Sequence, residues 1–350
     1  MQPYSILIVG PAWVGDMVMA HSLIKVLVNN RPSVKVDMLA PGWSTPIIKR
    51  IPEIHENIFL PVKHGELALR KRYNIARQLK ENSYDQAIIL PRSIKAALVP
   101  WLAKIPRRTG YKGEMRYRLI NDMRPFDQQS LDQTVKRYVA LGLEPGESLP
   151  IIPRPKITVA SHEKSKILSK FNLVKERPIV ALIPGAEYGP AKCWPISYFH
   201  KLSLLLKESG YDVLVLGSKK EINQGKQISS GSGATNLCGK TSLEEVIDLL
   251  ACCDCAVSND SGLLHVSAAL GIKVIGIYGS SSPDLTPPLT DNCKIHYLGI
   301  ECSPCFKRVC PLGHLNCLRN ITPETVIETI PFHILVSFFS KSHSVVSTRQ

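Results

Sequence analysis

The sequence has no long apolar run. None of the hydrophobic stretches in its 350 residues reaches the roughly 20 residues that a membrane-spanning helix requires. The chain opens on an apolar segment over residues 5–10, which predicts a buried strand, without the basic segment and cleavage site of a signal peptide. We therefore expect a protein that is not secreted, whose ten cysteines are thiols in a reducing compartment rather than disulfides.

Aromatic residues are scarce. They make up 7% of the chain, and no nucleic-acid recognition motif occurs, so we expect no nucleic-acid partner. An Asp-x-Asp pair, which would chelate a metal on a sugar nucleotide, is also missing. The net charge is nevertheless +14, and residues 104–118 hold six basic residues and one acid. This stretch is predicted either to meet an anion, such as a phosphorylated ligand or an acidic membrane, or to form a solvated basic face.

Strand-like and helix-like segments alternate in two blocks. The first block begins with the strand at residues 5–10, and the second begins with a buried strand at residues 179–183. Between them, residues 144–156 contain four prolines and one glycine, which predicts a linker. The sequence thus predicts an α/β protein with two Rossmann-like, doubly wound domains and a ligand cleft between them. The expected units are residues 1–155, residues 156–330 and a tail over 331–350 that returns to the first domain.

The most informative stretch runs from Cys255 to Pro283. An apolar strand, a polar turn and a helix over about 262–270 lead into a second buried strand, which is a βαβ unit. The helix would begin at the carboxyl edge of a parallel sheet, where free backbone N–H groups bind anions such as a diphosphate. Either Asp260 or Ser261 is predicted to cap it, and Asp260 alternatively accepts hydrogen bonds from sugar hydroxyls. His265 is predicted to be either a core imidazole or a ligand contact.

The turn after the first strand is Gly10-Pro-Ala-Trp-Val-Gly15-Asp16, which has the glycine spacing of a phosphate loop. Asp16 stands where such a loop carries its lysine, so the charge is wrong for a nucleoside triphosphatase. The turn is not G-x-G-x-x-G either, which argues against a dinucleotide dehydrogenase. Asp16 is predicted either to cap the helix over 16–30 or to point into the cleft as a general base. The two roles conflict, because accepting backbone N–H bonds lowers the pKa of a carboxyl.

The second domain opens with another glycine-rich turn, Pro184-Gly-Ala-Glu-Tyr-Gly-Pro-Ala-Lys192-Cys-Trp-Pro195. Lys192 lies just before a helix start, where its charge would stabilise a departing diphosphate. Glu221 follows the strand over 212–216, at the position where acidic residues of nucleotide-binding α/β units hold ribose hydroxyls.

Four cysteines lie within sixteen residues late in the chain: Cys302, Cys305, Cys310 and Cys317. In a reducing compartment this group predicts a metal site, with zinc ahead of an iron–sulfur cluster. The alternative is a set of buried thiols without metal. Any metal held there is expected to be structural.

Six segments in order resemble the heptosyltransferases of glycosyltransferase family 9. They are residues 10–17, 90–100, 108–117, 184–195, 259–270 and 278–289. The resemblance extends from the first strand to about residue 330. It implies a GT-B fold and an inverting transfer, without a catalytic metal or other cofactor, of L-glycero-D-manno-heptose from ADP-heptose. The implied acceptor is heptosyl-Kdo2-lipid A, at its first heptose.

The resemblance also implies residue roles. Asp16 corresponds to the general base, and Lys192 to the cation on the donor diphosphate. The implied donor contacts are Gly185, Ala186, Lys192, Glu221, Asp260, Ser261, Gly262 and His265. The implied acceptor contacts are Arg92, Lys95, Arg108 and Arg116.

The implied location is the cytoplasm, peripheral on the acidic cytosolic face of the inner membrane. Two other functions stay open at this point. One is a heptosyltransferase that acts at another core position, and the other is a nucleotide-sugar binding protein without catalysis.

Overall fold

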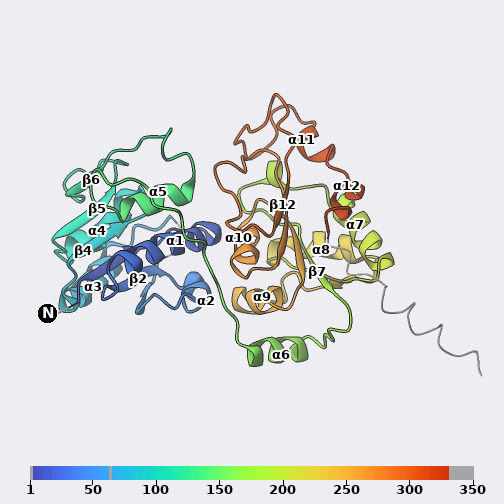
Figure 1. Ribbon diagram of the computed structural model, residues 1–350, viewed down its shortest axis with the longest axis horizontal. Helices are drawn as coiled ribbons and strands as arrows, with labels where there is room; N and C mark the ends of the chain where they lie inside the picture. Colours follow the sequence, from blue (N-terminus) through green and yellow to red (C-terminus); the bar gives the residue numbers. More distant parts are fainter. Residues whose placement is uncertain (1–2, 63–64, 331–350) are drawn as a thin grey trace, which may run out of the picture.

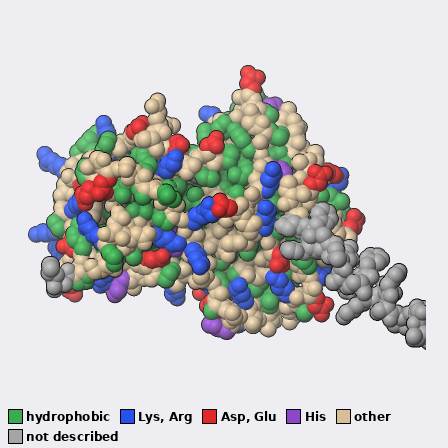
Figure 2. All heavy atoms as spheres, viewed as in Figure 1, with side chains coloured by type: hydrophobic (Ala, Val, Ile, Leu, Met, Phe, Trp, Pro, Cys, Tyr) green, Lys and Arg blue, Asp and Glu red, His purple; other side chains and the backbone are tan. Residues whose placement is uncertain are grey.

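The structure is a computed structural model, which describes residues 3–62 and 65–330. Two lobes lie side by side, each built around a six-stranded sheet, and an extended segment joins them (Figure 1). The predicted tail over 331–350 lies outside the described residues. Figure 2 shows Lys and Arg side chains standing out along the outer edge of the first lobe.

The first sheet has the strand order β3-β2-β1-β4-β5-β6, and all its pairs are parallel. Its strands are β1 (Ser5–Val9), β2 (Lys35–Pro41), β3 (Glu56–Leu60), β4 (Gln86–Ile89), β5 (Arg107–Tyr111) and β6 (Asp122–Arg124). Its α-helices are α1 (Val14–Asn30), α2 (Thr45–Ile48), α3 (Leu69–Leu79), α4 (Ile94–Leu102) and α5 (Thr134–Leu141). The chain reverses its winding between β1 and β4, which makes this point the expected ligand edge of the sheet.

The second sheet repeats this pattern as β12-β11-β10-β7-β8-β9, again parallel throughout. Its strands are β7 (Ile179–Ile183), β8 (Asp212–Val215), β9 (Thr235–Asn236), β10 (Cys255–Asn259), β11 (Lys273–Ile277) and β12 (Cys293–His296). The helices of this half are α6 (Ser161–Lys170), α7 (Ile196–Glu208), α8 (Ile222–Ser229), α9 (Leu243–Leu250), α10 (Gly262–Ala269), α11 (Asn316–Arg319) and α12 (Pro323–Ile327). The prediction of two doubly wound sheets is confirmed, while the domain boundary at residue 155 stays a prediction.

The central strands explain the fold. Strands β1 and β7 read Ser-Ile-Leu-Ile-Val and Ile-Val-Ala-Leu-Ile, and every residue of both is buried. Such continuous β-branched and apolar runs suit parallel strands that helices cover on both faces. In the second lobe the fully buried Trp194 packs edge-to-face on Phe199, with ring centroids 4.9 Å apart. Each lobe has a buried apolar cluster of its own, and a further buried cluster combines residues of both lobes.

The lobes meet through polar and apolar contacts. Arg50 after α2 donates to the Asp248 carboxylate of α9 at 2.5 Å. The linker residue Ile157 donates its backbone N–H to the Ala269 carbonyl at the end of α10. Figure 1 shows α1 and α10 facing each other across this junction. These contacts fix where the two ligand edges stand relative to each other.

No helix within residues 3–62 and 65–330 is both long enough and apolar enough to cross a lipid bilayer.

Candidate active site

The N-terminal ends of α1 and α10 approach so closely that only glycine fits between them. A Cβ atom added at Gly262 would lie 2.6 Å from the Cβ of Val14, and one at Gly15 would lie 2.7 Å from Cδ2 of His265. Real Cβ atoms do not tolerate such distances, so either substitution would force the lobes apart. The two glycines thus set the spacing of the interlobe site.

Asp16 occupies the first turn of α1 but does not cap it. The N-cap is Trp13, so the prediction that Asp16 is the N-cap is wrong. Its carboxylate instead accepts a hydrogen bond from the Tyr138 hydroxyl of α5 at 3.1 Å. Burial raises the pKa of Asp16, and the charge of Asp260 adds to this effect, against the opposing influence of Tyr138 and Lys192. A carboxylate with a raised pKa is a stronger base than an ordinary one.

Asp260 and Lys192 form an ion pair on the second lobe. The Asp260 side chain is 5% exposed and that of Lys192 is 19% exposed, so the pair is largely shielded from water. Ser261 is the N-cap of α10, yet no side-chain cap bond forms there. The prediction that one of these two residues caps α10 is thus confirmed for Ser261, and because its side chain makes no cap bond, the first N–H groups of α10 remain available to an anion.

His265 lies one turn into α10 and is 5% exposed. Burial lowers its pKa, so the imidazole is neutral at pH 7. Its Nε2 atom is 4.0 Å from Oδ1 of Asp260, and its buried Nδ1 atom has no hydrogen-bond partner among the described residues. The imidazole ring thus lies against Gly15 at the contact between α1 and α10, and its Nδ1 atom makes no hydrogen bond to the described residues.

A cavity of about 240 Å³ brings these groups together between the lobes. It is lined by Asp16 from the first lobe and by Lys192, Asp260, Ser261, Gly262 and His265 from the second. Sequence reasoning assigned no site role to several other lining residues, among them Met19, Tyr188 and Thr286. Tyr188 and Thr286 lie in the segments 184–195 and 278–289 that carry the family resemblance, whereas Met19 lies outside all six segments.

A second cavity, of about 610 Å³, adjoins the first and shares its residues Trp13, Gly15, Glu187, Ser261 and Gly262. The predicted donor contacts Gly185, Ala186 and Glu221 line it. The Glu221 carboxylate accepts hydrogen bonds from the N–H and hydroxyl of Ser218, both at 2.7 Å. A Cβ at Gly185 would lie 2.9 Å from the Glu221 carboxyl carbon, so glycine leaves room for this acid at the cavity wall.

The apolar part of the second cavity was not predicted. Trp43, Leu216, Leu243 and Val246 line it, and the buried Thr241 hydroxyl beside them has no hydrogen-bond partner within the described part of the chain. The signal that could have located it is the start of α9, where Ser242 forms a capping box with Glu245. An apolar slot ending in an unused hydroxyl suits a flat heterocycle.

The basic stretch over 104–118 is not one exposed patch. Arg107 pairs with Asp122 at 2.9 Å and with Glu144 at 2.6 Å. The Arg108 guanidinium donates to the Leu119 carbonyl at 2.8 Å and to the Ile105 carbonyl. Arg107 and Arg108 therefore serve local structure, so the six basic residues of this stretch do not form one exposed face.

Arg116 lies inside the first lobe and is 1% exposed. Its guanidinium donates to the carbonyls of Pro91 and Tyr111 at 2.7 and 2.6 Å. The guanidinium groups of Arg108 and Arg116 thus donate to backbone carbonyls. Neither residue lines the cavity described next. Direct acceptor contact by these two arginines is not supported by their positions.

A third cavity, of about 790 Å³, opens at the carboxyl edge of the first sheet. Lys95, a predicted acceptor contact, lines it together with Trp43, Phe59 and Lys71. Arg92 lies near its rim but bonds to the Lys112 carbonyl at 3.2 Å and stacks on the Phe126 ring. Trp43 belongs to both this cavity and the 610 Å³ cavity, so the two are neighbours across the interlobe junction.

The four late cysteines line one cavity of about 20 Å³ together with His314. Thiolates are the donors that zinc and iron prefer, so the donor chemistry fits a metal. Backbone N–H groups, that of Leu315 foremost, lower the pKa of Cys310, which favours its thiolate form. Among the described residues, no three ligand atoms of this group lie within 4.8 Å of one another, so metal binding would require the loop to tighten.

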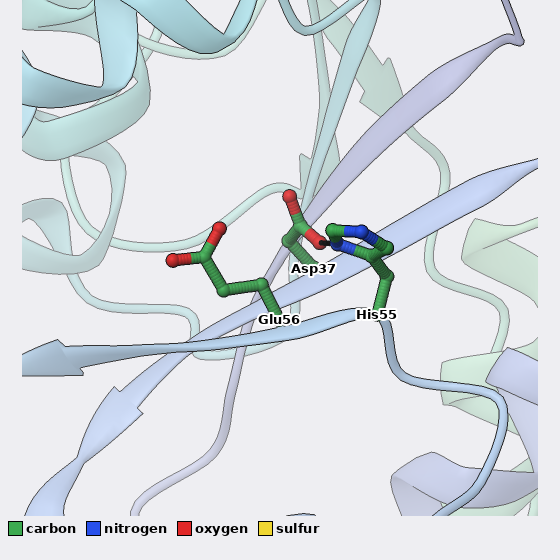
Figure 3. Close-up of side chains that lie close together, drawn as sticks. All are labelled: Asp37, His55 and Glu56. Atoms are coloured by element: carbon green, nitrogen blue, oxygen red, sulfur yellow. Dashed lines mark hydrogen bonds and ion pairs between the residues drawn. The ribbon is translucent and has the colours of Figure 1, made fainter.

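Another group of side chains lies close enough together to hold a metal ion. Among the described residues, only the ligand atoms of Asp37, His55 and Glu56 form a set of three or more within 4.8 Å of one another (Figure 3). The buried Asp37 carboxylate already accepts from the Tyr84 hydroxyl at 2.6 Å and pairs with Nδ1 of His55 at 3.0 Å. Figure 3 shows Glu56 to one side, without a bond to the other two. Asp37 therefore ties β2 to the segments before β3 and β4.

Two Rossmann-like lobes whose carboxyl edges face one junction form a GT-B-like fold, and a carboxylate and a cation meet at that junction. The model of the family "Glycosyltransferase family 9 (heptosyltransferase)" matches residues 72–316. The chain belongs to this family.

Relatives match along nearly the whole chain. Lipopolysaccharide heptosyltransferase 2 of Salmonella typhimurium is 40% identical over 344 residues, covering 95% of this chain and 98% of the relative. The protein of the same name from Escherichia coli K12 is 40% identical over 93% of this chain and 97% of its own length. The solved structure of E. coli ADP-heptose lps heptosyltransferase II superposes with a TM-score of 0.83 at 38% identity, covering 93% of this chain and 96% of that one.

The variant Asp16→Asn tests the proposed role of Asp16 as the general base. The amide keeps the shape and the bond from Tyr138 but cannot take a proton, so kcat should fall by about 10²–10⁴ while the donor KM stays nearly unchanged. Steady-state kinetics checks this, with Asp132→Asn, an exposed acid on the same lobe, as the control. Full turnover by Asp16→Asn would remove the residue from this role.

The variant Lys192→Gln tests the proposed role of Lys192 as the cation that binds the donor diphosphate. Loss of charge-assisted bonds should weaken ADP binding by roughly 10- to 100-fold, measured by calorimetry. The variant also leaves the buried Asp260 unpaired, which should destabilise the fold by about 3–5 kcal/mol. The double variant Lys192→Gln/Asp260→Asn should recover stability but not ADP affinity. ADP affinity that is unchanged in the single variant contradicts the assignment.

Proposed function

We propose that this chain is an inverting heptosyltransferase that transfers L-glycero-D-manno-heptose from ADP-heptose to the first heptose of the lipopolysaccharide inner core. The observation that carries the proposal is the meeting of Asp16 with Lys192 and Asp260 at one interlobe cavity. The names of the relatives, lipopolysaccharide heptosyltransferase 2, support the choice of acceptor.

The donor spans the two adjoining cavities. The adenine fits the apolar slot by Trp43 and Leu243, where the unused Thr241 hydroxyl offers a hydrogen bond. Glu221 accepts from ribose hydroxyls, and Gly185 and Ala186 line the path beside it. The diphosphate then meets Lys192 and the N-terminus of α10, which leaves the 240 Å³ cavity for the heptose.

The reaction is a single displacement. Asp16 removes the proton from the acceptor hydroxyl as its oxygen attacks the anomeric carbon on the face opposite the diphosphate. The bond from that carbon to the diphosphate oxygen breaks, and ADP leaves with the electron pair. Lys192 and the N–H groups at the start of α10 stabilise the added negative charge. Asp260 holds Lys192 in place and accepts from donor hydroxyls, next to the neutral His265.

The acceptor occupies the 790 Å³ cavity of the first lobe. Trp43 and Phe59 supply apolar faces for its sugar rings, and Lys71 and Lys95 supply charge for Kdo carboxylates or phosphates. The donor is a water-soluble nucleotide and the acceptor is lipid-anchored, so the chain acts at the cytosolic face of the inner membrane as a peripheral protein.

The decisive assay supplies ADP-heptose with Kdo2-lipid A that either carries or lacks its first heptose. We expect transfer only to the heptosylated acceptor, followed by mass spectrometry of the product. Transfer to another core position would favour a sister heptosyltransferase. Tight ADP-heptose binding without any transfer would identify a nucleotide-sugar binding protein.

Lys95→Gln separates acceptor from donor binding. Loss of one charge at the cavity wall should raise the acceptor KM by about tenfold and reduce its salt dependence, with the donor KM unchanged. Lys80→Gln, an exposed lysine after α3, is the matched control. An acceptor KM that does not move would place the acceptor elsewhere.

The four cysteines are proposed to hold a structural metal, with zinc as the first choice. Cys302, Cys305, Cys310 and Cys317 would supply thiolates, and the ion would crosslink a loop that packs against the Lys192 segment. Two bonds support that coupling: the N–H of Ala191 donates to the Arg308 carbonyl at 3.0 Å, and the Tyr188 hydroxyl donates to the Phe306 carbonyl at 2.8 Å.

Metal analysis of the purified protein should find about one equivalent of zinc, and Cys302→Ser/Cys305→Ser should remove it and lower Tm. Cys293→Ser, outside this loop, should keep the metal. Less than half an equivalent of zinc or iron in the unaltered protein rejects the site.

A further inference from the structure

A surface of the first lobe carries exposed apolar side chains that line none of the cavities described above. They come from α4 and from the loop over residues 112–118. Their exposed fractions are 40% for Ile94, 44% for Trp101, 85% for Met115 and 60% for Tyr117. We call these four residues, together with Lys95, Lys112 and Arg118, the α4 surface.

The loop is held rigidly against the start of α4. The buried Arg116 donates to carbonyls on both sides of it, those of Pro91 and Tyr111. The Glu114 carboxylate accepts the backbone N–H of Ile94 at 2.7 Å, and the N–H of Glu114 donates to the Arg92 carbonyl. Met115 and Tyr117 flank the buried Arg116, so the anchor that fixes the loop also turns these two side chains outward beside Ile94.

The helix adds an apolar stripe. Ile94, Leu98 and Trp101 recur at a spacing of four and three residues, so they lie on one face of α4. The opposite face is the buried one, formed by Ala96, Ala97, Val99 and Pro100. An amphipathic helix normally turns its apolar side to the core, whereas α4 has apolar residues on both sides. The outer stripe is therefore available to a partner.

Three basic residues lie close in the sequence to these exposed apolar side chains. Lys95 follows Ile94 in α4, and Lys112 and Arg118 frame the loop that bears Met115 and Tyr117. Within the described residues none of these three cations forms an ion pair, and the nearest acid in sequence, Glu114, is engaged with the helix start. Exposed apolar groups together with cationic residues match a bilayer that contains acidic phospholipids.

The α4 surface also lies next to the cavity that would receive a lipid-anchored acceptor. Ser93, Lys95 and Ala96 from the start of α4 line the 790 Å³ cavity, so the α4 surface borders the cavity that we assign to the acceptor. We propose that the α4 surface docks this chain on acidic phospholipid, with Met115 and Tyr117 inserted between headgroups. The inference rests on the proposed function, because a lipid-anchored acceptor would then reach the cavity directly from the bilayer.

The test measures cosedimentation with vesicles in the absence of donor and acceptor. The protein should bind vesicles of phosphatidylethanolamine and phosphatidylglycerol but not of phosphatidylcholine alone. Met115→Ser/Tyr117→Ser should lower the partition coefficient about tenfold or more, and Lys112→Ser/Arg118→Ser should lower it to a similar extent. Ile151→Ser/Val174→Ser removes apolar side chains that are 97% and 69% exposed elsewhere, and should change nothing.

Transfer to a deacylated, water-soluble acceptor provides the second measurement. It should be unchanged in Met115→Ser/Tyr117→Ser, which also shows that the variant folds. Equal vesicle binding by this variant and the unaltered protein would overturn the proposal. So would loss of self-association without loss of vesicle binding, because the surface would then join two copies of the chain. Vesicle binding does not depend on which sugar is transferred, so this inference and the proposed function can fail separately.

Discussion

The closeness of α1 and α10 is the constraint on which the rest of the site depends. Gly15 and Gly262 let the two helix ends touch, and this contact places a first-lobe carboxylate at the same cavity as the second-lobe ion pair. Asp16 and Asp260 are like charges in a shielded place, so they cannot be equivalent. Lys192 pairs with Asp260, and burial raises the pKa of Asp16. This difference supports our proposal that Asp260 positions the cation while Asp16 acts as the base.

The repeated topology explains how this arrangement arises. In each sheet the winding reverses beside the first strand, and the glycine-rich turns after β1, β7 and β10 emerge at that edge. The sheets face each other with their carboxyl edges toward the junction, and the contact between Arg50 and Asp248 holds the lobes in register. Three cavities follow along the junction, and Trp43 belongs to two of them. The α4 surface borders the 790 Å³ cavity at one end of this series.

The sequence was informative where function is encoded locally. Continuous apolar strands and the turns that follow them predicted both sheets, and the turn chemistry identified Asp16, Lys192 and Asp260, which the structure brings to one cavity. The sequence was misleading where a side chain bonds to a distant partner. Arg107 pairs with Glu144, and Arg116 donates to backbone carbonyls on both sides of its loop. The run of basic residues over 104–118 therefore does not form one exposed patch. The apolar slot of the 610 Å³ cavity was missed because Trp43, Leu216 and Thr241 share no local pattern. The predicted cap of α10 is found at Ser261, whereas the N-cap of α1 is Trp13 and not Asp16.

The pH dependence of kcat/KM tests the central claim most directly, because only the ionised Asp16 accepts a proton. Since burial raises its pKa, activity should fall with decreasing pH around a midpoint above the ordinary carboxyl value of 3.8. The residual activity of Asp16→Asn should lack this acidic limb. A limb that persists unchanged in Asp16→Asn, or that lies at the ordinary carboxyl value, would contradict the account.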